Sequence, residues 1–410
     1  MNLYIFNELS KASVYGVGTY LRELIEVLRC THINVFVVKL MSNNPQIQKE
    51  EIDGIRYWNF PSPIQEKHSI DTKRQNELYC HNIVCLLQLH IENKNNLIFH
   101  LNYNQYGEFA KELKQVFDCR IIATIHSLAW SLRLFGNVAL LKKILTPDEL
   151  DQKEELKNTI IQSFRKEKDL YETVDRIISL SEHTKHILLD DYQINPKKIK
   201  VIYNGISDRN FFADKHELRQ KYHIPDVPVF LFAGRLDEGK GLTFAIQAFR
   251  KVHNRNNCHF IIAGNGVFDL FMKECEGIWM YVTWTGMINK ECLYDLYSIA
   301  DIGILPSLSE QCNYVAIEMM MHGLPIVTSA APGLAEMTED GISSLQVPVT
   351  EYPDKVEIDT DLLAEKMLYL LQNPDERQRL GSNARKRYEE VYTMDVFRKN
   401  MIAFYQSIYE

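Results

Sequence analysis

Two glutamates, Glu310 and Glu318, lie eight positions apart in the run 301–327. This run predicts a buried strand at 302–305, a polar loop, a helix of a little over two turns, and a second buried strand. Glu310 then lies in the loop at the carboxyl end of a strand, and Glu318 lies on the helix that follows. Two carboxylates placed in this way could hold two parts of one extended ligand.

Two cations lie in a glycine-bearing loop earlier in the chain. Arg235 and Lys240 are five positions apart in the segment 234–242, which follows a predicted strand and leads into a predicted helix. Both can reach one pyrophosphate, the arginine as a planar fork and the lysine as a point charge. They would hold a nucleotide diphosphate and neutralise the charge that develops as it leaves a sugar. For an isolated pair of this kind, two solvated loop cations are the simpler interpretation.

The order of these features resembles the signature of the retaining, nucleotide-sugar-dependent glycosyltransferases of family four. The loop, the helix, Gly323-Leu-Pro325 and the second strand follow one another as in that family, and the string Gly-Arg-Leu-x-x-x-Lys-Gly also matches. The resemblance covers nearly the whole chain and is strongest over residues 234–327. It implies an α/β protein of GT-B architecture, in which two Rossmann-like, doubly wound parallel-sheet domains face each other across a cleft.

The resemblance also assigns roles to residues of the second half. Glu310 would bind sugar hydroxyls, and Glu318 would bind the ribose diol. The backbone amides around Asn313, Tyr314 and Val315 would meet the sugar and the phosphate. The Arg-Lys loop would replace the divalent metal that other glycosyltransferases need, so no metal and no other cofactor is expected.

One part of the loop departs from the family pattern. Many relatives have Glu-Gly-Phe-Gly where this chain has Glu310-Gln311-Cys312-Asn313. Because side chains replace two glycines there, the sugar preference does not follow from the family, whereas the expected fold is unaffected.

A third glycine site lies near the amino terminus, where Gly16 and Gly18 follow the first predicted strand and open a helix. Glycines let the backbone approach a phosphate, and a helix amino end offers free amides. The dinucleotide fingerprint is incomplete, since Leu21 stands where its third glycine would be. A tight turn explains the glycines equally well, but in the family this loop reaches the donor phosphate.

His126 ends the predicted strand 121–125, so it should lie at the carboxyl edge of the sheet. Most lone histidines are core or surface residues. Family members, however, carry a histidine at the end of this strand, where its ring or backbone carbonyl lies beside the donor sugar. The resemblance thus places Glu310, His126, Arg235 and Lys240 in the catalytic machinery.

Short apolar runs alternate with helix-length segments along both halves of the chain, which indicates parallel sheets covered on both faces. The predicted strands are 3–6, 33–38, 97–101, 121–125 and 177–180 in the first half and 229–233, 259–263, 281–284, 302–305 and 326–328 in the second. A polar stretch at 205–226 separates the halves. In the family a helix like 394–410 crosses back to the first domain, so the predicted domains are 1–205 plus 394–410, and 206–393.

Composition excludes several classes of protein. With 410 residues the chain can form two domains, and 46% hydrophobic and 24% charged residues are ordinary for a globular protein. The formal net charge of −8 argues against a general nucleic-acid binder. Eight scattered cysteines without metal-binding spacing indicate free thiols in a reducing compartment. Without a basic leader or a long apolar run, we expect a cytoplasmic protein, with peripheral contact at the inner membrane face as an option.

Two further features have competing interpretations. Asp359 and Asp361 look like the metal-binding Asp-x-Asp of another glycosyltransferase class, but capping of the helix that follows explains both. The stretch from Trp130 to Leu145 mixes large apolar residues with cations. It could contact a membrane-borne acceptor, or it could pack as a helix on the first domain.

The resemblance implies transfer of a hexose-type sugar from a uridine, guanosine or adenosine diphosphate donor to a hydroxyl on a glycan, lipid-linked saccharide or peptide. The anomeric configuration would be retained. No residue is an obvious nucleophile, so a front-face mechanism is expected, in which the departing phosphate takes the acceptor proton. A nucleotide-sugar epimerase of the same architecture and a non-catalytic partner subunit are the alternatives.

Overall fold

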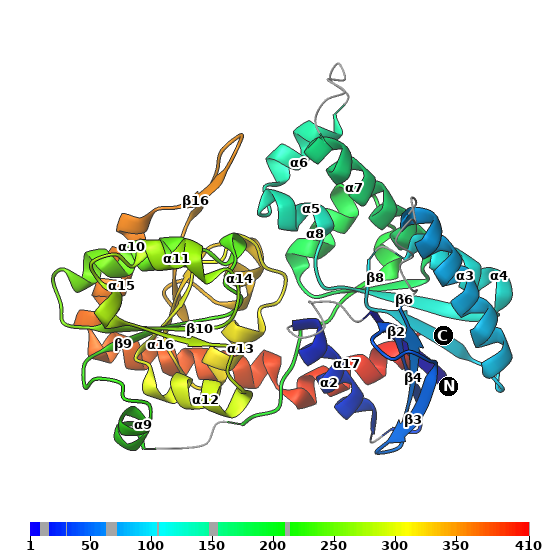
Figure 1. Cartoon of the computed structure of the whole chain (residues 1–410), viewed down its shortest axis with the longest axis horizontal. Helices are drawn as coiled ribbons and strands as arrows, with labels where there is room; N and C mark the ends of the chain where they lie inside the picture. The colour runs from blue at the N-terminus through cyan, green and yellow to red at the C-terminus, as the bar shows by residue number, and fades with distance from the viewer. Residues whose placement is uncertain are drawn as a thin grey trace. The chain divides into compact units, whose positions relative to one another are not determined.

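The computed structural model contains two compact units (Figure 1). It describes residues 1–8, 16–29, 31–62, 72–104, 106–146, 155–209 and 214–409. Unit 1 comprises Met1–Trp130, Pro147–Asn204 and Met394–Glu410, and unit 2 comprises Ser131–Thr146 and Gly205–Thr393. The domains predicted from the sequence differ from this division mainly in one segment, because residues 131–146 group with unit 2.

Unit 1 contains an eight-stranded sheet in the order β3-β4-β2-β1-β5-β6-β7-β8, in which β3 alone pairs antiparallel. Its strands are β1 (Asn2–Glu8), β2 (Asn34–Ser42), β3 (Gln48–Ile52), β4 (Ile55–Pro61), β5 (Leu97–Leu101), β6 (Cys119–Ile125), β7 (Arg176–Ser179) and β8 (Ile199–Val201). The helices of this unit are α2 (Gly16–Arg29), α3 (Thr72–His90), α4 (Gly107–Val116), α7 (Glu155–Thr173), α8 (Glu182–Asp190), the short η1 (Pro196–Lys198) and α17 (Met394–Gln406). Helix α5 (Ala129–Leu134) begins in unit 1, whereas α6 (Val138–Leu145) lies wholly in the segment that groups with unit 2. All five strands predicted for this half are present.

Unit 2 contains a six-stranded sheet in the order β11-β10-β9-β12-β13-β14, with parallel pairing throughout. Its strands are β9 (Val229–Ala233), β10 (His259–Ala263), β11 (Val282–Gly286), β12 (Ile302–Leu305), β13 (Ile326–Ser329) and β14 (Ser344–Val347), and β15 (Val349–Glu351) and β16 (Val356–Ile358) form a separate antiparallel pair. The helices are α9 (Lys215–Lys221), η2 (Glu238–Lys240), α10 (Leu242–His253), α11 (Phe268–Glu274), η3 (Trp279–Tyr281), α12 (Lys290–Ile299), α13 (Tyr314–Met321), α14 (Pro332–Met337), α15 (Thr360–Gln372), α16 (Pro374–Arg387) and η4 (Tyr388–Tyr392).

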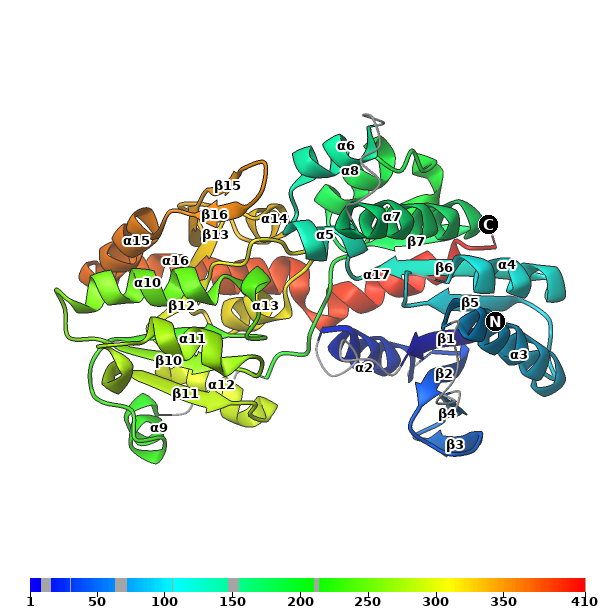
Figure 2. The ribbon, with the colours of Figure 1, turned by 45° about the horizontal axis from the view of Figure 1, so that its top comes forward.

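Helices cover both faces of the unit 2 sheet (Figure 2), as the alternation of side chains along its strands requires. Ile302 and Ile304 of β12 pack into a buried apolar cluster with residues of α10 and α15. Gly303, between them, faces the other side, where a Cβ atom would lie 2.5 Å from the sulfur of Met319 on α13. The sheet is therefore doubly wound.

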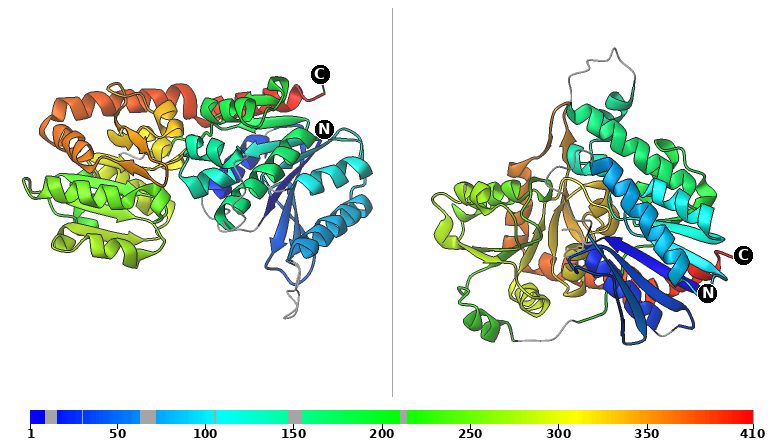
Figure 3. Two further views of the ribbon diagram at one scale, coloured as in Figure 1. Left: turned by 90° about the horizontal axis from the view of Figure 1, so that it is seen from above. Right: turned by 45° about the vertical axis from the view of Figure 1, so that its right-hand side comes forward.

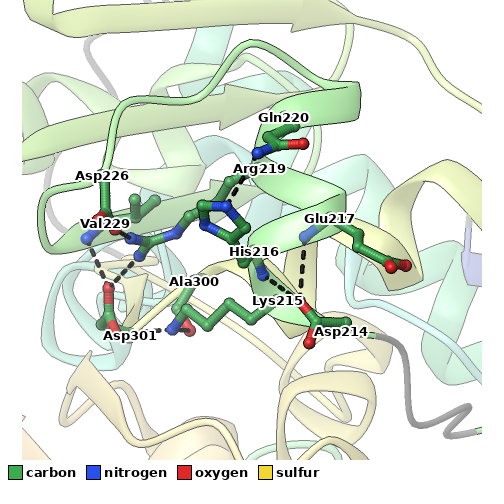
Figure 4. Close-up of polar contacts among 10 residues, drawn as sticks. All are labelled: Asp214, Lys215, His216, Glu217, Arg219, Gln220, Asp226, Val229, Ala300 and Asp301. Carbon is green, nitrogen blue, oxygen red and sulfur yellow. Dashed lines mark hydrogen bonds and ion pairs between the residues drawn. The ribbon is translucent and has the colours of Figure 1, made fainter.

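Asp301, directly before β12, joins three elements at the amino edge of this sheet (Figure 4). Its Oδ2 accepts hydrogen bonds from the Val229 amide at 2.8 Å and from Arg219 Nη2 at 3.0 Å. Its Oδ1 accepts one from Lys215 Nζ at 2.7 Å. Strand β9, its neighbour β12 and helix α9 are thereby fixed relative to one another, which also fixes the loops that leave β9 and β12 at the opposite edge.

Helix α17 packs on the core of unit 1, where both ends of the chain lie (Figure 3). The hydroxyl of Tyr405 lies 2.7 Å from Nδ1 of His100, which is fully buried in β5. The ring of Phe397 meets that of Tyr20 at 5.8 Å. Among the described residues, no helix combines the length and apolar character needed to cross a bilayer.

Candidate functional site

The loop between β9 and α10 depends on a glycine at a point of close approach. Gly241 has φ +69°, and a Cβ atom there would lie 1.9 Å from the carbonyl oxygen of Pro306. Only glycine fits such a position. The loop that carries Lys240 therefore lies directly against the loop that leaves β12.

Lys240 and Glu310, predicted from separate motifs, meet at this contact. The Lys240 Nζ lies 2.5 Å from Glu310 Oε1, and both side chains are largely buried. The side-chain amide of Asn313 donates a hydrogen bond from Nδ2 to the same oxygen at 2.8 Å. The cluster places a cation, a carboxylate and an amide at the carboxyl edge of the sheet, where ligands bind in open α/β sheets.

Arg235 lies on the same loop as Lys240. Its Nη2 is 3.2 Å from Asp237 Oδ2, and both side chains are about two-fifths exposed. Asp237 caps η2 by accepting a hydrogen bond from the Lys240 amide at 3.2 Å. The loop thus carries a half-exposed guanidinium and a largely buried ammonium group.

Asn313 caps the amino end of α13. Its Oδ1 accepts hydrogen bonds from the amides of Val315 at 2.8 Å and Ala316 at 3.2 Å. The backbone N–H of Asn313 donates to the sulfur of Met337 at 3.1 Å. The resemblance implied that the Val315 amide meets the ligand. In this structure that amide is instead bound by the cap, because asparagine at this position supplies an acceptor that the family's glycine lacks.

Glu318 is enclosed by residues of α12. Its side chain is 1% exposed, its Oε1 forms an ion pair with Lys290, and its Oε2 accepts a hydrogen bond from the Tyr297 hydroxyl at 2.9 Å. Nothing in the sequence pointed to Lys290 and Tyr297. Their place on an ordinary amphipathic helix gave no signal of this partnership, which only the packing of α12 against α13 creates.

In unit 1, His126 directly follows β6, as predicted. Its Nε2–H donates to the side-chain oxygen of Asn102 at 3.0 Å, and its ring meets the edge of Tyr20 at 4.7 Å. Burial lowers the pKa of His126 to about 3. The imidazole is therefore neutral near pH 7 and can bind a ligand through a dipole or its backbone carbonyl, but not through a positive charge.

Gly16 and Gly18 lie in the first turn of α2. The glycines therefore belong to the helix start itself, whose first amides have no partner within the helix. Residues 13–15 of the same motif lie outside the described residues.

The stretch from Trp130 to Leu145 does not pack as a helix on the first domain alone. Residues 131–146 group with unit 2, where Ser131 Oγ lies 2.7 Å from Ser309 Oγ, next to Glu310. Asn137 donates a hydrogen bond to the Tyr352 carbonyl at 2.9 Å. Trp130 and Leu141 are fully buried, whereas Leu132 is 59% exposed.

Comparison with known families accounts for both units. Residues 214–387 match the family model described as glycosyl transferases group 1, and residues 14–210 match glycosyltransferase family 4. The chain belongs to this glycosyltransferase family. The GT-B fold that the resemblance implied is thereby confirmed.

Curated relatives of this glycosyltransferase are distant. An uncharacterized glycosyltransferase of Methanocaldococcus jannaschii is 29% identical over 240 residues, which are 56% of this chain and 60% of that protein. The alpha-D-kanosaminyltransferase of Streptomyces kanamyceticus is 27% identical over 205 residues, or 49% of this chain and 51% of that protein. The chain thus spans a little over half the length of these relatives.

Solved structures match over the whole chain. Sucrose-phosphate synthase from Thermosynechococcus elongatus has a TM-score of 0.77 at 21% identity, covering 100% of this chain and 99% of that one. An Anabaena protein solved in complex with UDP and glucose has a TM-score of 0.73 at 15% identity, covering 99% and 100%. At these identities the likeness shows the fold.

Proposed function

We propose that this glycosyltransferase moves a hexose-type sugar from a nucleotide diphosphate donor to a hydroxyl acceptor, with retention of the anomeric configuration. The observation that carries the proposal is the contact of Lys240, Glu310 and Asn313. It brings an ammonium group, which can bind phosphate, together with a carboxylate and an amide, which can bind sugar hydroxyls. The kanosaminyltransferase relative and the Anabaena complex with UDP and glucose support a sugar donor of this kind.

The reaction would depend on charge at the leaving group. Arg235 and Lys240 would bind the diphosphate and stabilise the negative charge that it gains as its bond to the anomeric carbon breaks. In the free protein, Lys240 pairs with Glu310. A bound diphosphate would take over the lysine, and Glu310 would then accept hydrogen bonds from sugar hydroxyls.

The acceptor hydroxyl would attack the anomeric carbon from the face that the diphosphate leaves. The new carbon–oxygen bond would form on that face, and a phosphate oxygen of the leaving group would take the acceptor proton. Glu310 accepts hydrogen bonds from Lys240 and Asn313 in the free protein, and in the reaction it would accept them from sugar hydroxyls instead of attacking as a nucleophile. His126, which is neutral near pH 7, would hold the sugar by its ring or carbonyl.

We also propose that the reaction needs no divalent metal. Asp359 caps α15 by accepting hydrogen bonds from the amides of Asp361 and Leu362, and Asp361 pairs with Lys251 at 2.7 Å. Both carboxylates thus have the helix-start roles expected from the sequence. The proposal rests on Arg235 and Lys240, whose charges would serve in place of the metal.

A donor screen followed by a transfer assay tests the proposal. A ligand that binds only the folded state raises the apparent stability of the protein. When UDP-, GDP- and ADP-sugars are compared, the true donor should therefore raise the melting temperature of the protein. The stabilising donor is then incubated with glycan, lipid-linked and peptide acceptors, and the anomeric configuration of the product is read by NMR. Conversion of the donor alone into an isomer would instead indicate an epimerase. Absence of stabilisation by every donor would indicate a non-catalytic partner subunit.

A further inference from the structure

A fully buried carboxylate in unit 1 has no role in the mechanism above. Glu167 lies on α7 and is 0% exposed. Its Oε1 accepts hydrogen bonds from Asn104 Nδ2 at 2.5 Å and from the Ala129 amide at 2.8 Å. Its Oε2 accepts one from the Tyr192 hydroxyl at 2.5 Å. Burying a carboxylate is costly unless its oxygens are satisfied, so this convergence of three donors is a built arrangement.

Aromatic side chains surround these hydrogen bonds. Phe164 stacks on Tyr192 with ring centroids 4.1 Å apart, and Tyr171 meets the edge of Tyr192 at 5.2 Å. Trp130 is also fully buried. In these surroundings, burial raises the pKa of Glu167 to about 7. The carboxylate is held by neutral donors, because each of the three hydrogen bonds comes from an amide or a hydroxyl.

Two of the contacts lead to the turn that follows β6. Ala129, bound directly by Glu167, lies three residues after His126. Asn104 Nδ2, which donates to Glu167, also donates to the Ser127 carbonyl at 2.7 Å. Glu167 thus holds the turn 126–129 at its far end directly and near its start through Asn104.

The opposite side of this turn is fixed by other groups. Asn102, which directly follows β5, accepts the hydrogen bond of His126, and the ring of Tyr20 packs against the imidazole. His126 therefore sits between one support from the sheet and α2, and a second support from α7. Removing the second support leaves the ring's own hydrogen bond in place but frees the backbone that follows it.

We propose that Glu167 is a positioning residue, which acts through the turn 126–129 to hold His126 where the donor sugar is to bind. The proposal rests on the proposed function, since it assumes that His126 meets the sugar. Glu167 itself touches no substrate. Its effect should therefore fall on the transfer step and not on the binding of the nucleotide.

The test is Glu167→Gln, which keeps the shape but replaces one acceptor oxygen by a donor. A misplacement of about 1 Å at a reacting group can cost roughly 10²-fold in rate. We expect kcat to fall about 10- to 100-fold, with the donor KM changed less than about threefold. Glu172→Gln is the matched control, because Glu172 lies on the same helix with 59% of its side chain exposed and pairs only loosely with Lys168, at 3.8 Å. It should leave kcat within about twofold.

A pH profile separates positioning from general loss of structure. The ionised carboxylate can accept all three hydrogen bonds, whereas protonation as the pH falls through about 7 turns one oxygen into a donor. Wild-type kcat should therefore decline below pH 7, and the Glu167→Gln profile should be flat there. The titratable groups that face Glu167 are Tyr171 and Tyr192, whose pKa values burial raises further above this range. His126 has its pKa near 3 and does not titrate there.

The ring resonances of His126 give a readout that needs no turnover. These resonances should shift in Glu167→Gln and stay in place in Glu172→Gln. The comparison requires that the two variants have equal melting temperatures. If Glu167→Gln does not fold, Tyr192→Phe removes a single donor and should produce a smaller shift and a smaller loss of kcat. Unchanged His126 resonances together with an unchanged kcat would overturn the proposal. If the wild type transfers no sugar, the proposed function fails, and the resonances alone decide whether Glu167 positions His126.

Discussion

The positive charge of Lys240 should interact with different partners before and during the reaction. It pairs with Glu310 in the free protein and, in the proposed reaction, stabilises the departing diphosphate. We expect Lys240→Ala to lower turnover by roughly 10²-fold or more, the scale seen when a preorganised charge stabiliser is removed. Steady-state kinetics measure this, with Lys251→Ala on α10 as the control, because Lys251 pairs with the exposed Asp361. Near-normal turnover in folded Lys240→Ala protein would remove Lys240 from the site.

The two glutamates should divide the donor between them. Glu318→Gln should weaken bare nucleotide diphosphate and intact donor alike, by about ten- to a hundredfold, since one charge-assisted hydrogen bond is worth roughly 1.5–3 kcal/mol. Glu310→Gln should leave the affinity for the bare nucleotide diphosphate within about twofold while donor turnover falls. Calorimetry with the bare nucleotide on both variants measures the difference. An equal loss in the two variants would contradict the assignment.

Activity should also survive an excess of EDTA, because Arg235 and Lys240 would supply the positive charge at the diphosphate. Asp359 is bound to amides and Asp361 to Lys251 in the structure. The measurement is the transfer rate before and after chelation, with and without added manganese or magnesium. A rate that vanishes with EDTA and returns with metal would contradict this expectation. It would favour Asp359 and Asp361 as metal ligands.

The sequence predicts those site residues that lie in a recognisable local motif. Lys240 and Glu310 are predicted because the segments around them match the family pattern, whereas the charges alone would favour solvated loop residues. Glu167 and Lys290 carry no such signal, since a charged residue on an amphipathic helix is normally solvated. Their importance arises from neighbours distant in sequence, such as Asn104 for Glu167, and these contacts exist only in the folded chain.

At the scale of elements, apolar runs predicted the central strands and missed some at the edge. β9, β10 and β12 have the predicted bounds, because a strand buried on both faces is apolar throughout. β3 was missed because every one of its residues is exposed and most are polar or charged. Its strand conformation comes from antiparallel pairing with β4, which a local pattern does not reveal.

The contacts of Asp301 should contribute strongly to the stability of unit 2. Asp301→Asn removes the charge that three donors share and leaves Lys215 and Arg219 less well paired. We expect a loss of about 1–3 kcal/mol in the free energy of unfolding. Asp226→Asn is the matched control, because Asp226 pairs with the same arginine but is 86% exposed, and it should cost less than about 1 kcal/mol. Denaturant unfolding of both variants measures the difference, and equal losses would contradict the role of Asp301.

At the scale of the molecule, the stability of unit 1 should depend on residues at the far end of the chain. Phe397 of α17 is 1% exposed and packs on Tyr20 of α2. Phe397→Ala should cost roughly 3–5 kcal/mol and should raise amide hydrogen exchange in β1, α2 and β5, with unit 2 unchanged. The exposed Lys399, two residues along the same helix, provides the control Lys399→Ala, which should leave both units unchanged. A uniform rise in exchange over both units would show that α17 does not serve unit 1 specifically.

The position of α17 has a consequence for the order in which the protein matures on the ribosome. Domains generally fold as units while the chain is being made, the first one first. Here the strands of unit 1 emerge early, but the helix that covers Tyr20 and His100 is synthesised after the whole of unit 2. Unit 2 can therefore finish folding while the apolar surface of unit 1 waits for its last helix. During translation, chaperones should find their binding sites on the earlier half of the chain, and premature termination after residue 393 should leave a folded second unit attached to an incomplete first one.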